Sequence, residues 1–265
     1  MDFKAVLTTL LNDFTRYKIH YALIGGFALG LWGVGRATVD LDFLVHRDDL
    51  DKIKQIMSEL GYELHYSSEN VSQFISPLKV FGEIDFLHAF RELSLEMLKN
   101  SVEKDIFNSS AKIKVLRPED LIGLKLHGLK LHGIKLHGIK NDPSRAQSDL
   151  QDIKSLLSLH HDTLDYTLIK KYFTYLKIED LYQQITGDAH KMECTKQDFH
   201  QSELDNDTQS LNYDMQWIAS HRHNPFVKDT GIDVDAYIEF VSQYNEFINH
   251  EPKKFKAIID REMIL

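Results

Sequence analysis

The sequence contains little cysteine and no long apolar run. One of its 265 residues is a cysteine, Cys194, so no internal disulfide framework is expected and a reducing compartment fits. No apolar stretch approaches the roughly 20 residues that span a bilayer. The first residues, Met1-Asp-Phe-Lys4, include charged residues where a secretory signal would be continuously apolar. We therefore expect a cytoplasmic protein with no membrane partner.

The chain also lacks an excess of positive charge. Its 31 Lys and Arg residues are outnumbered by 40 Asp and Glu residues, which gives a formal net charge of −9. A broad basic surface along a nucleic-acid backbone is disfavoured, and DNA is not an expected partner, although a local basic groove stays compatible with these numbers. The charge balance modestly favours a small substrate or a protein partner.

What is present is the pattern of a mixed α/β domain followed by helices. Helices are expected over residues 2–16, 27–32 and 48–60 and from Pro118 and Pro143 onward; strands are expected at 21–24, 38–45, 62–66, 71–75, 79–87 and 112–116. After about residue 160 the strand signals end. We therefore predict an α/β (α+β) domain over residues 1–160 and a helical C-terminal domain over 161–265. Within the latter, the polar segment 187–214 reads as a long loop or a partly disordered stretch.

Two glycines and two carboxylates carry the first chemical signal. Gly25 and Gly26 end the apolar strand at Tyr21–Ile24, and a backbone turn of this kind suits phosphate groups. Asp40 and Asp42 alternate with apolar residues, so their side chains share one face of a strand, about 6.6 Å apart along the chain. Hard cations such as Mg2+ or Mn2+ bind oxygen ligands, and two such metals clamp the attacking and leaving oxygens in phosphoryl transfer.

A third carboxylate follows in Gly82-Glu-Ile-Asp-Phe-Leu87. Asp85 lies between Ile84 and Phe86 in an apolar strand, where a charge is costly unless it meets a cation. Each element alone has an ordinary structural explanation: a Gly-Gly turn is usually only a turn, and an Asp-x-Asp strand is often a solvated face. In this order and spacing, together they indicate a site for a metal and a nucleoside triphosphate.

These residues resemble a known superfamily. Leu23-Ile-Gly-Gly-Phe27, Gly35-Arg-Ala-Thr-Val-Asp-Leu-Asp-Phe-Leu-Val45 and Ile84-Asp-Phe86 are similar to the motifs of the DNA-polymerase-β-type nucleotidyltransferases. Arg117–Lys125 and Arg145–Asp152 add a resemblance to the bacterial minimal nucleotidyltransferases and the abortive-infection, AbiEii-like toxins. The resemblance covers about residues 1–160 and implies a nucleotidyltransferase-type mixed sheet flanked by helices.

The resemblance implies a role for each motif residue. Gly25 and Gly26 would contact the triphosphate, and three carboxylates would hold Mg2+ (or Mn2+) and carry catalysis: Asp40, Asp42 and Asp85. Asp85 would also help to activate the attacking hydroxyl. Arg36 and Thr38 flank the metal strand, where a cation and a hydroxyl could meet phosphate oxygens, although Arg36 also fits an exposed loop arginine. The second motif residue is Gly26 instead of serine, which loses a hydroxyl near the phosphates.

A repeated pentad obscures the family lysine. The sequence Leu-Lys-Leu-His-Gly starts at Leu124 and at Leu129, and Ile-Lys-Leu-His-Gly follows at Ile134. Because a five-residue period turns about 140° around a helix, the three histidines share no face and a helical zinc pair is disfavoured: His127, His132 and His137. The better interpretation is a duplicated helix-forming pentad that lengthens an element or loops out.

The repeat leaves three lysines with the same local sequence. Counting forward from Pro118 selects Lys125 as the phosphate partner, whereas counting back from Arg145 selects Lys135. Lys130 has the same pentad around it. We take Lys125.

The sequence thus predicts a metal-dependent nucleotidyltransferase that moves a nucleoside monophosphate from an NTP to a hydroxyl. The acceptor would be a tRNA end, a partner protein or a small molecule, and the resemblance fits a toxin–antitoxin or phage-defence system. The alternative is a catalytically inactive nucleotide-binding module that acts through protein–protein interaction. A hydrolase with a histidine metal site in the repeat is a third, disfavoured interpretation.

Overall fold

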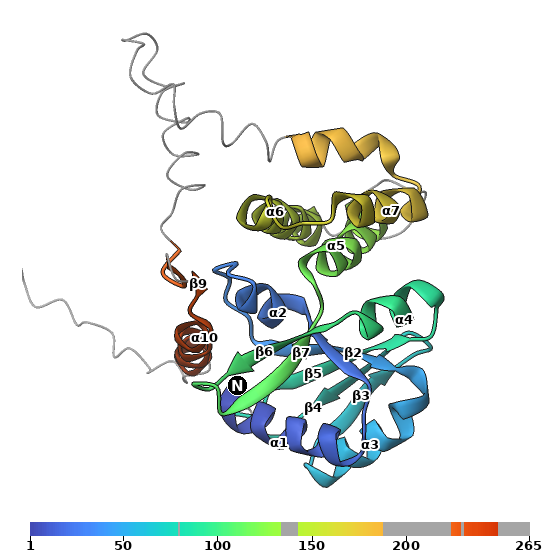
Figure 1. Cartoon of the computed structure of the whole chain (residues 1–265). Coiled ribbons are helices and arrows are strands. Elements are labelled where there is room, and N and C mark those ends of the chain that lie inside the picture. The colour runs from blue at the N-terminus through green and yellow to red at the C-terminus, as the bar shows by residue number, and fades with distance from the viewer. Residues whose placement is uncertain (79, 134–142, 188–223, 229–230, 249–265) are drawn as a thin grey trace, which may run out of the picture.

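The computed structural model describes residues 1–78, 80–133, 143–187, 224–228 and 231–248 (Figure 1). The third pentad with Lys135, most of the polar segment 187–214 and the tail after Ile248 lie outside these residues. Within the described ranges, no helix combines the length and the hydropathy needed to cross a bilayer.

A seven-stranded mixed sheet forms the centre of the molecule, in the order β3-β4-β5-β2-β1-β7-β6. Strand β1 runs antiparallel to β2 and parallel to β7, and β2 runs parallel to β5. The strands are β1 (Tyr21–Ile24), β2 (Asp40–His46), β3 (Glu63–Ser67), β4 (Val71–Ile75), β5 (Glu83–Ala89), β6 (Val102–Ile106) and β7 (Ala111–Val115). Two further short strands, β8 (Val227–Lys228) and β9 (Gly231–Ile232), form a separate hairpin.

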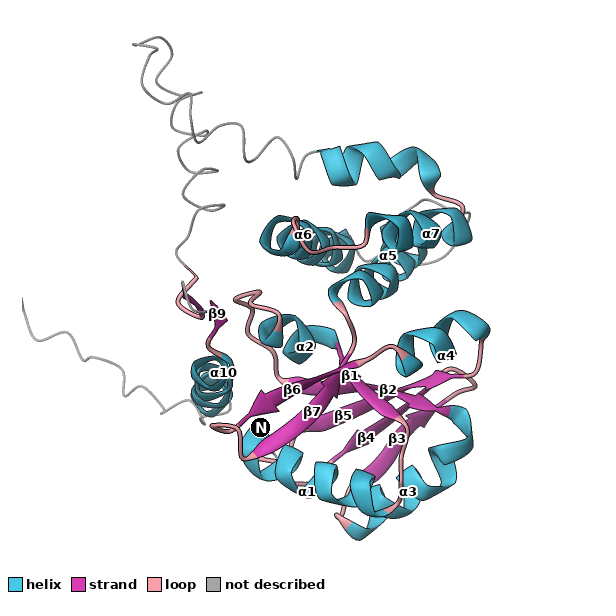
Figure 2. Ribbon diagram, viewed as in Figure 1, coloured by secondary structure: helices cyan, strands magenta, loops and turns pink. Residues whose placement is uncertain are grey.

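Helices cover both faces of the sheet (Figure 2). In Figure 1, α1 and α3 lie below the sheet, α2 and α4 lie above it, and α5 to α7 stack beyond α2 and α4. The last helix, α10, packs against α1 and α2. The helices are α1 (Phe3–Arg16), α2 (Gly25–Leu31), α3 (Leu50–Glu59), α4 (Glu92–Lys99), α5 (Pro118–Gly133), α6 (Pro143–His160), α7 (Tyr166–Leu176) and α10 (Val234–Ile248).

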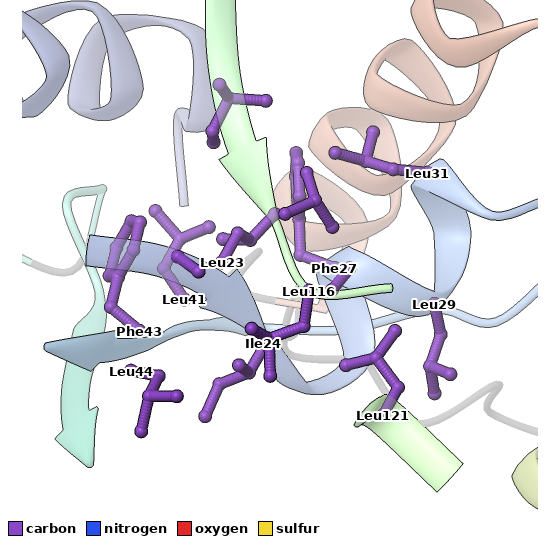
Figure 3. Packing of buried hydrophobic residues seen from close by; sticks show 14 of the residues in the cluster. Leu23, Ile24, Phe27, Leu29, Leu31, Leu41, Phe43, Leu44, Leu116 and Leu121 are labelled. Carbon is purple, nitrogen blue, oxygen red and sulfur yellow. The ribbon is translucent and has the colours of Figure 1, made fainter. Parts of the chain in front are cut away.

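The core extends over both faces of the sheet, and its layer between α1 and the sheet fixes which way the strands face. The apolar positions of α1 recur at helical spacing and are all buried. Phe14 of α1 contacts the edge of Phe43 of β2, and Phe43 stacks on Phe86 of β5 with ring centroids 5.8 Å apart. Figure 3 shows Phe43 packed with Leu23 and Leu41 in this layer. Because neighbouring residues of a strand alternate in direction, the aspartates between these apolar residues project from the other face.

Most of the predicted elements are confirmed. The helix over 2–16, the strand at 21–24, the three-strand meander that ends in β5 and the helices that begin at Pro118 and Pro143 are all present. The mixed sheet with flanking helices matches the nucleotidyltransferase fold that the resemblance implies. The domain division at residue 160 stays a prediction.

The structure corrects the prediction at several positions. The strand predicted over 38–45 begins only at Asp40, so Val39 precedes β2 and is 47% exposed. Strand β5 begins at Glu83 and not at residue 79, after a turn in which Gly82 has a positive φ. Helix α4 and the edge strand β6 were not predicted. The β6 sequence Val-Glu-Lys-Asp-Ile has three charged residues in succession, which hides its half-buried alternation.

Candidate active site

The register of two parallel strands brings two predicted carboxylates side by side. Asp42 of β2 is the direct partner of Asp85 of β5, and adjacent strands lie about 4.8 Å apart. Both residues are half-buried, while their apolar neighbours Phe43 and Phe86 are completely buried toward α1. Asp40 lies two residues earlier on β2, so it shares the face of Asp42. The three aspartates therefore occupy one face of two neighbouring strands.

The carboxylate of Asp40 accepts a hydrogen bond from a threonine hydroxyl. The side chain of Thr38 donates a hydrogen bond from Oγ1 to Oδ1 of Asp40 at 2.7 Å, and Thr38 itself is 8% exposed. Among the residues described, no three His, Cys, Asp or Glu side chains gather closely enough to hold a metal ion by themselves. Mg2+ is usually bound by one or two carboxylates together with phosphate oxygens and water, so the Asp42–Asp85 pair has the donor chemistry for a cation that arrives with a triphosphate.

The two glycines lie directly against these side chains. Gly25 has a φ of +69°, a conformation that L-residues rarely adopt, and a Cβ atom there would lie 1.8 Å from Oδ2 of Asp42. A Cβ atom at Gly26 would lie 2.7 Å from the hydroxyl oxygen of Thr38. Gly25 thus approaches the Asp42 side chain of β2 closely, and Gly26 approaches Thr38 in the loop before β2, so a side chain at either position would force these groups to move. The predicted phosphate turn and the predicted metal strand are neighbours in space.

The predicted phosphate-binding cations meet at an acidic pair on α6. Lys125 of α5 places Nζ 2.8 Å from Oδ1 of Asp149 and 2.9 Å from Oδ2 of Asp152. Arg36, in the loop before β2, pairs with the same oxygen of Asp152. The aspartate side chains are 9% and 5% exposed, and that of Lys125 is 17% exposed, so the pair is largely shielded from water. This cluster joins α5 and α6 to the loop that leads into β2.

The structure distinguishes two of the three repeated lysines. Lys130 donates a hydrogen bond from Nζ to the carbonyl oxygen of Leu176 at 2.6 Å, so it faces α7. Lys125 faces the Arg36 side instead, and Lys135 lies outside the described residues. The first two pentads are part of α5, which agrees with a repeat that lengthens a helix. Of its three histidines, only His127 has a described side chain.

Two groups of residues near the site were missed or given no role by sequence reasoning. Asp149 and Asp152 lie in the segment Arg145–Asp152 that carries part of the resemblance, but neither was given a role. Tyr237 and Asn245 of α10 were missed entirely as site residues, although they hydrogen-bond to backbone carbonyl groups of Arg36 and Thr38 at 3.0 Å and 2.8 Å. The predicted helical C-terminal domain includes this segment, but no local signal indicates what the helix packs against.

The sheet has a glycine turn after its central strand β1, and the two strands that follow β1 in the sheet, β2 and β5, carry the carboxylates. This is the arrangement of a nucleotidyltransferase fold. The chain belongs to a nucleotidyltransferase family: the family described as "Uncharacterised nucleotidyltransferase" matches residues 3–192. A comparison with curated proteins finds no match.

Several solved structures resemble the chain at low sequence identity. The antibiotic-resistance factor ANT(2'')-Ia is 12% identical; the match covers 72% of this chain and 100% of that protein, with a TM-score of 0.48. The lincosamide antibiotic adenylyltransferase LnuA, bound to lincomycin, is 18% identical, with 58% and 96% covered and a TM-score of 0.37. A tRNA nucleotidyltransferase complexed with a primer tRNA and an incoming ATP analog is 14% identical, with 94% and 86% covered and a TM-score of 0.27. The family assignment rests on the match over residues 3–192 and not on these solved structures.

Proposed function

We propose that this nucleotidyltransferase is metal-dependent and transfers a nucleoside monophosphate from an NTP to a hydroxyl group, with release of pyrophosphate. The observation that supports this most directly is the pairing of Asp42 with Asp85 across two parallel strands, with the backbone of Gly25 against the Asp42 carboxylate. Solvated surface carboxylates do not require a glycine with positive φ packed against them. A site that must admit phosphates beside its carboxylates does.

Asp42 and Asp85 would hold Mg2+ or Mn2+. Asp40, which is oriented by its hydrogen bond from Thr38, would be the third carboxylate ligand. When bound, the divalent cation neutralises charge on the phosphate oxygens and favours loss of the proton from the acceptor hydroxyl. Gly25 and Gly26 present backbone to the triphosphate, and Arg36 and Lys125 supply positive charge on the α5 and α6 side. The chain mainly positions the reactants and stabilises developing charge.

The transfer itself is an in-line displacement at the α-phosphorus. The acceptor oxygen forms a bond to this phosphorus, the bond from phosphorus to the bridging oxygen of pyrophosphate breaks, and its electron pair leaves with pyrophosphate. The carboxylate of Asp85 accepts the proton of the acceptor hydroxyl. No oxidant or reductant is needed, because the reaction breaks a phosphoanhydride bond and forms a phosphate ester bond with no change of oxidation state.

The acceptor is the finer part of the proposal. The similarity of Arg117–Lys125 and Arg145–Asp152 to AbiEii-like proteins supports a tRNA end or a partner protein as acceptor, within a toxin–antitoxin or phage-defence system. The net charge of −9 favours a compact contact with an acceptor over a broad basic track along RNA. A small-molecule hydroxyl is the remaining acceptor class.

Labelled nucleotide tests the proposal directly. The full chain is incubated with each α-labelled NTP and Mg2+ or Mn2+, with total tRNA or cell extract as acceptor, and pyrophosphate and labelled products are measured. We expect transfer that EDTA abolishes and that Asp42→Asn or Asp85→Asn lowers by about 10²-fold or more, as for loss of a charge-stabilising group. Asp51→Asn is the matched control, because that carboxylate is 99% exposed on α3.

The alternative, an inactive nucleotide-binding module, predicts a different result. Such a protein would bind NTP in a calorimeter but release no pyrophosphate with any acceptor, and Asp42→Asn would change binding only. That outcome would overturn the proposed activity. Mass spectrometry of cellular RNA and protein after induced expression, searched for one added nucleotide, then identifies the acceptor if transfer occurs.

A further inference from the structure

The loop between α2 and β2, residues 32–39 (the α2–β2 loop), carries two of the proposed site residues, Arg36 and Thr38. It contains two glycines, at 33 and 35, and it has no regular secondary structure after Gly33. Backbone groups outside helices and strands need other hydrogen-bond partners when they are buried. The partners of three of its carbonyl groups come from a part of the chain about 200 residues later.

Tyr237 of α10 reaches the loop and the glycine turn at once. Its hydroxyl donates a hydrogen bond to the carbonyl oxygen of Arg36 at 3.0 Å and lies 3.3 Å from that of Gly26. The residue is completely buried, and burial raises the pKa of its hydroxyl, so the group stays a donor at physiological pH. Its ring lies against Gly30 of α2, where a Cβ atom would come within 1.8 Å of Cζ. The glycine admits the tyrosine, and the tyrosine spans α2 and the loop.

Two asparagines hold the loop at its other carbonyl groups. The amide of Asn245, two turns after Tyr237 on α10, donates to the carbonyl oxygen of Thr38 at 2.8 Å, and Asn245 is 1% exposed. Asn224 donates from Nδ2 to the carbonyl oxygen of Gly33. The loop is thus held near its start, its middle and its end by side chains of the C-terminal region.

From these contacts we propose that α10 belongs to the active site, and that Tyr237 and Asn245 are positioning residues which hold Arg36 and Thr38 in place. The inference rests on the proposed function for its catalytic consequence, but the hold on the loop is a separate structural claim. Residues 237 and 245 lie after the part of the chain that matches the family, which ends at residue 192. The site of this chain therefore extends past the family region.

The direction of the effect follows from what the loop carries. Thr38 orients Asp40, and Arg36 supplies a charge for the triphosphate, so a loosened loop weakens the grip on NTP more than on the acceptor. Partial unfolding, by contrast, would lower the active fraction and hence kcat, while the KM of the folded remainder stayed unchanged. KM for NTP therefore separates positioning from a merely structural role.

Tyr237→Phe keeps the ring against Gly30 and removes only the hydroxyl, and Asn245→Leu keeps the shape and removes the amide donor. For each variant we expect KM for NTP to rise about tenfold, the size of one lost hydrogen bond, with little change in KM for the acceptor. Tyr244→Phe is the matched control, because Tyr244 lies on the same helix with 38% of its surface exposed. It should behave as the wild type.

Hydrogen–deuterium exchange tests the hold on the loop without any activity. In both variants, peptides that cover residues 33–39 should exchange at least about tenfold faster, whereas peptides of β4 and β5 should not change. Unchanged exchange over 33–39 in both variants would overturn the proposal, and so would a KM for NTP equal to that of the wild type in an active enzyme. Faster loop exchange in a protein that transfers no nucleotide would sustain the positioning claim and overturn the proposed function instead.

Discussion

The guanidinium of Arg36 pairs with the carboxylate of Asp152, 116 residues later in the chain. The same carboxylate oxygen contacts Lys125, so one largely buried aspartate joins the loop before β2 to two helices. Removing this buried carboxylate would leave both cations short of a counter-charge. This relationship makes Asp152 a stability residue as well as a neighbour of the site.

Asp152→Asn should lower the free energy of unfolding by about 2 kcal/mol, less than the 3–5 kcal/mol of a fully buried pair because the Arg36 side chain is 38% exposed. Urea denaturation at neutral pH measures this change. Asp51→Asn, an identical substitution at an exposed carboxylate, should leave the midpoint unchanged. An Asp152→Asn midpoint equal to that of the wild type would contradict the role assigned to the Arg36–Asp152–Lys125 cluster.

Lys125→Gln should raise KM for NTP by about tenfold or more, because a charged hydrogen bond to phosphate is worth roughly 1.5–3 kcal/mol. Lys130→Gln changes the same residue type in the same pentad, but its ammonium faces the Leu176 carbonyl group. It should leave KM for NTP unchanged. Steady-state kinetics with both variants shows which lysine contacts the phosphates. An effect of Lys130→Gln alone would assign the family lysine to the second pentad.

Gly25→Ala and Gly61→Ala form a matched pair. Both glycines have a positive φ, +69° and +77°, so each alanine meets a similar backbone strain of about 1 kcal/mol. Only the Cβ atom at Gly25 collides with Asp42, whereas nothing lies within 4 Å of the position at Gly61. We expect a larger loss of stability in Gly25→Ala, because the Asp42 side chain must move, and a loss of nucleotide transfer of about 10²-fold in that variant alone. Equal activity of the two variants would show that the close approach has no catalytic role.

Lys104 of β6 should make stability depend on pH in the alkaline range. Its ammonium lies 3.6 Å from the centroid of the Trp32 ring and 2.9 Å from the Leu31 carbonyl oxygen, and burial lowers its pKa to about 8. The unfolded chain keeps the ordinary lysine pKa of about 10.4, so between pH 8 and 10 the unfolded state binds a proton that the folded state has lost. The free energy of unfolding therefore rises as the pH increases from about 8 to about 10. This gain is fully present above the unfolded pKa and is lost as the pH falls to the folded pKa of about 8.

Urea denaturation of the wild type and Lys104→Met at pH 7.5, 8.5 and 9.5 isolates this group. The free energy of unfolding of the wild type should rise relative to that of the variant by up to about 1 kcal/mol per pH unit. A difference that stays constant over this range would mean that Lys104 keeps its proton in the folded state.

Sequence reasoning reached the carboxylate face because its evidence is local. The alternation around Asp40 and Asp42 fixes a strand face within a few residues, and Asp85 has the same surroundings on β5. The pairing of Asp42 with Asp85 is not local, because it depends on the strand order of the sheet. The resemblance implied only a mixed sheet and a shared site for the three aspartates, and the structure shows that the two strands are neighbours.

The contacts of α10 could not be predicted in this way. Tyr237 and Asn245 are ordinary residues of an amphipathic helix, and their sequence does not name the carbonyl groups that they meet. Only the absence of a side chain at Gly30 marks the receiving position, and a glycine in a helix has many explanations. Likewise, the pairing of Asp152 on α6 with Arg36 depends on a contact across 116 residues, which no local pattern indicates.

The separation between the α2–β2 loop and α10 also orders events during synthesis. Arg36 and Tyr237 are 201 residues apart, and a ribosome that adds about 5–20 residues per second needs on the order of 10–40 seconds to cover that interval. The strands of the sheet, which end with β7 at Val115, are made well before α10 exists. In a nascent chain, β2 and β5 can therefore pair before Tyr237 and Asn245 are available to bind the α2–β2 loop. The loop can be anchored by Tyr237 and Asn245 only after α10 has been made.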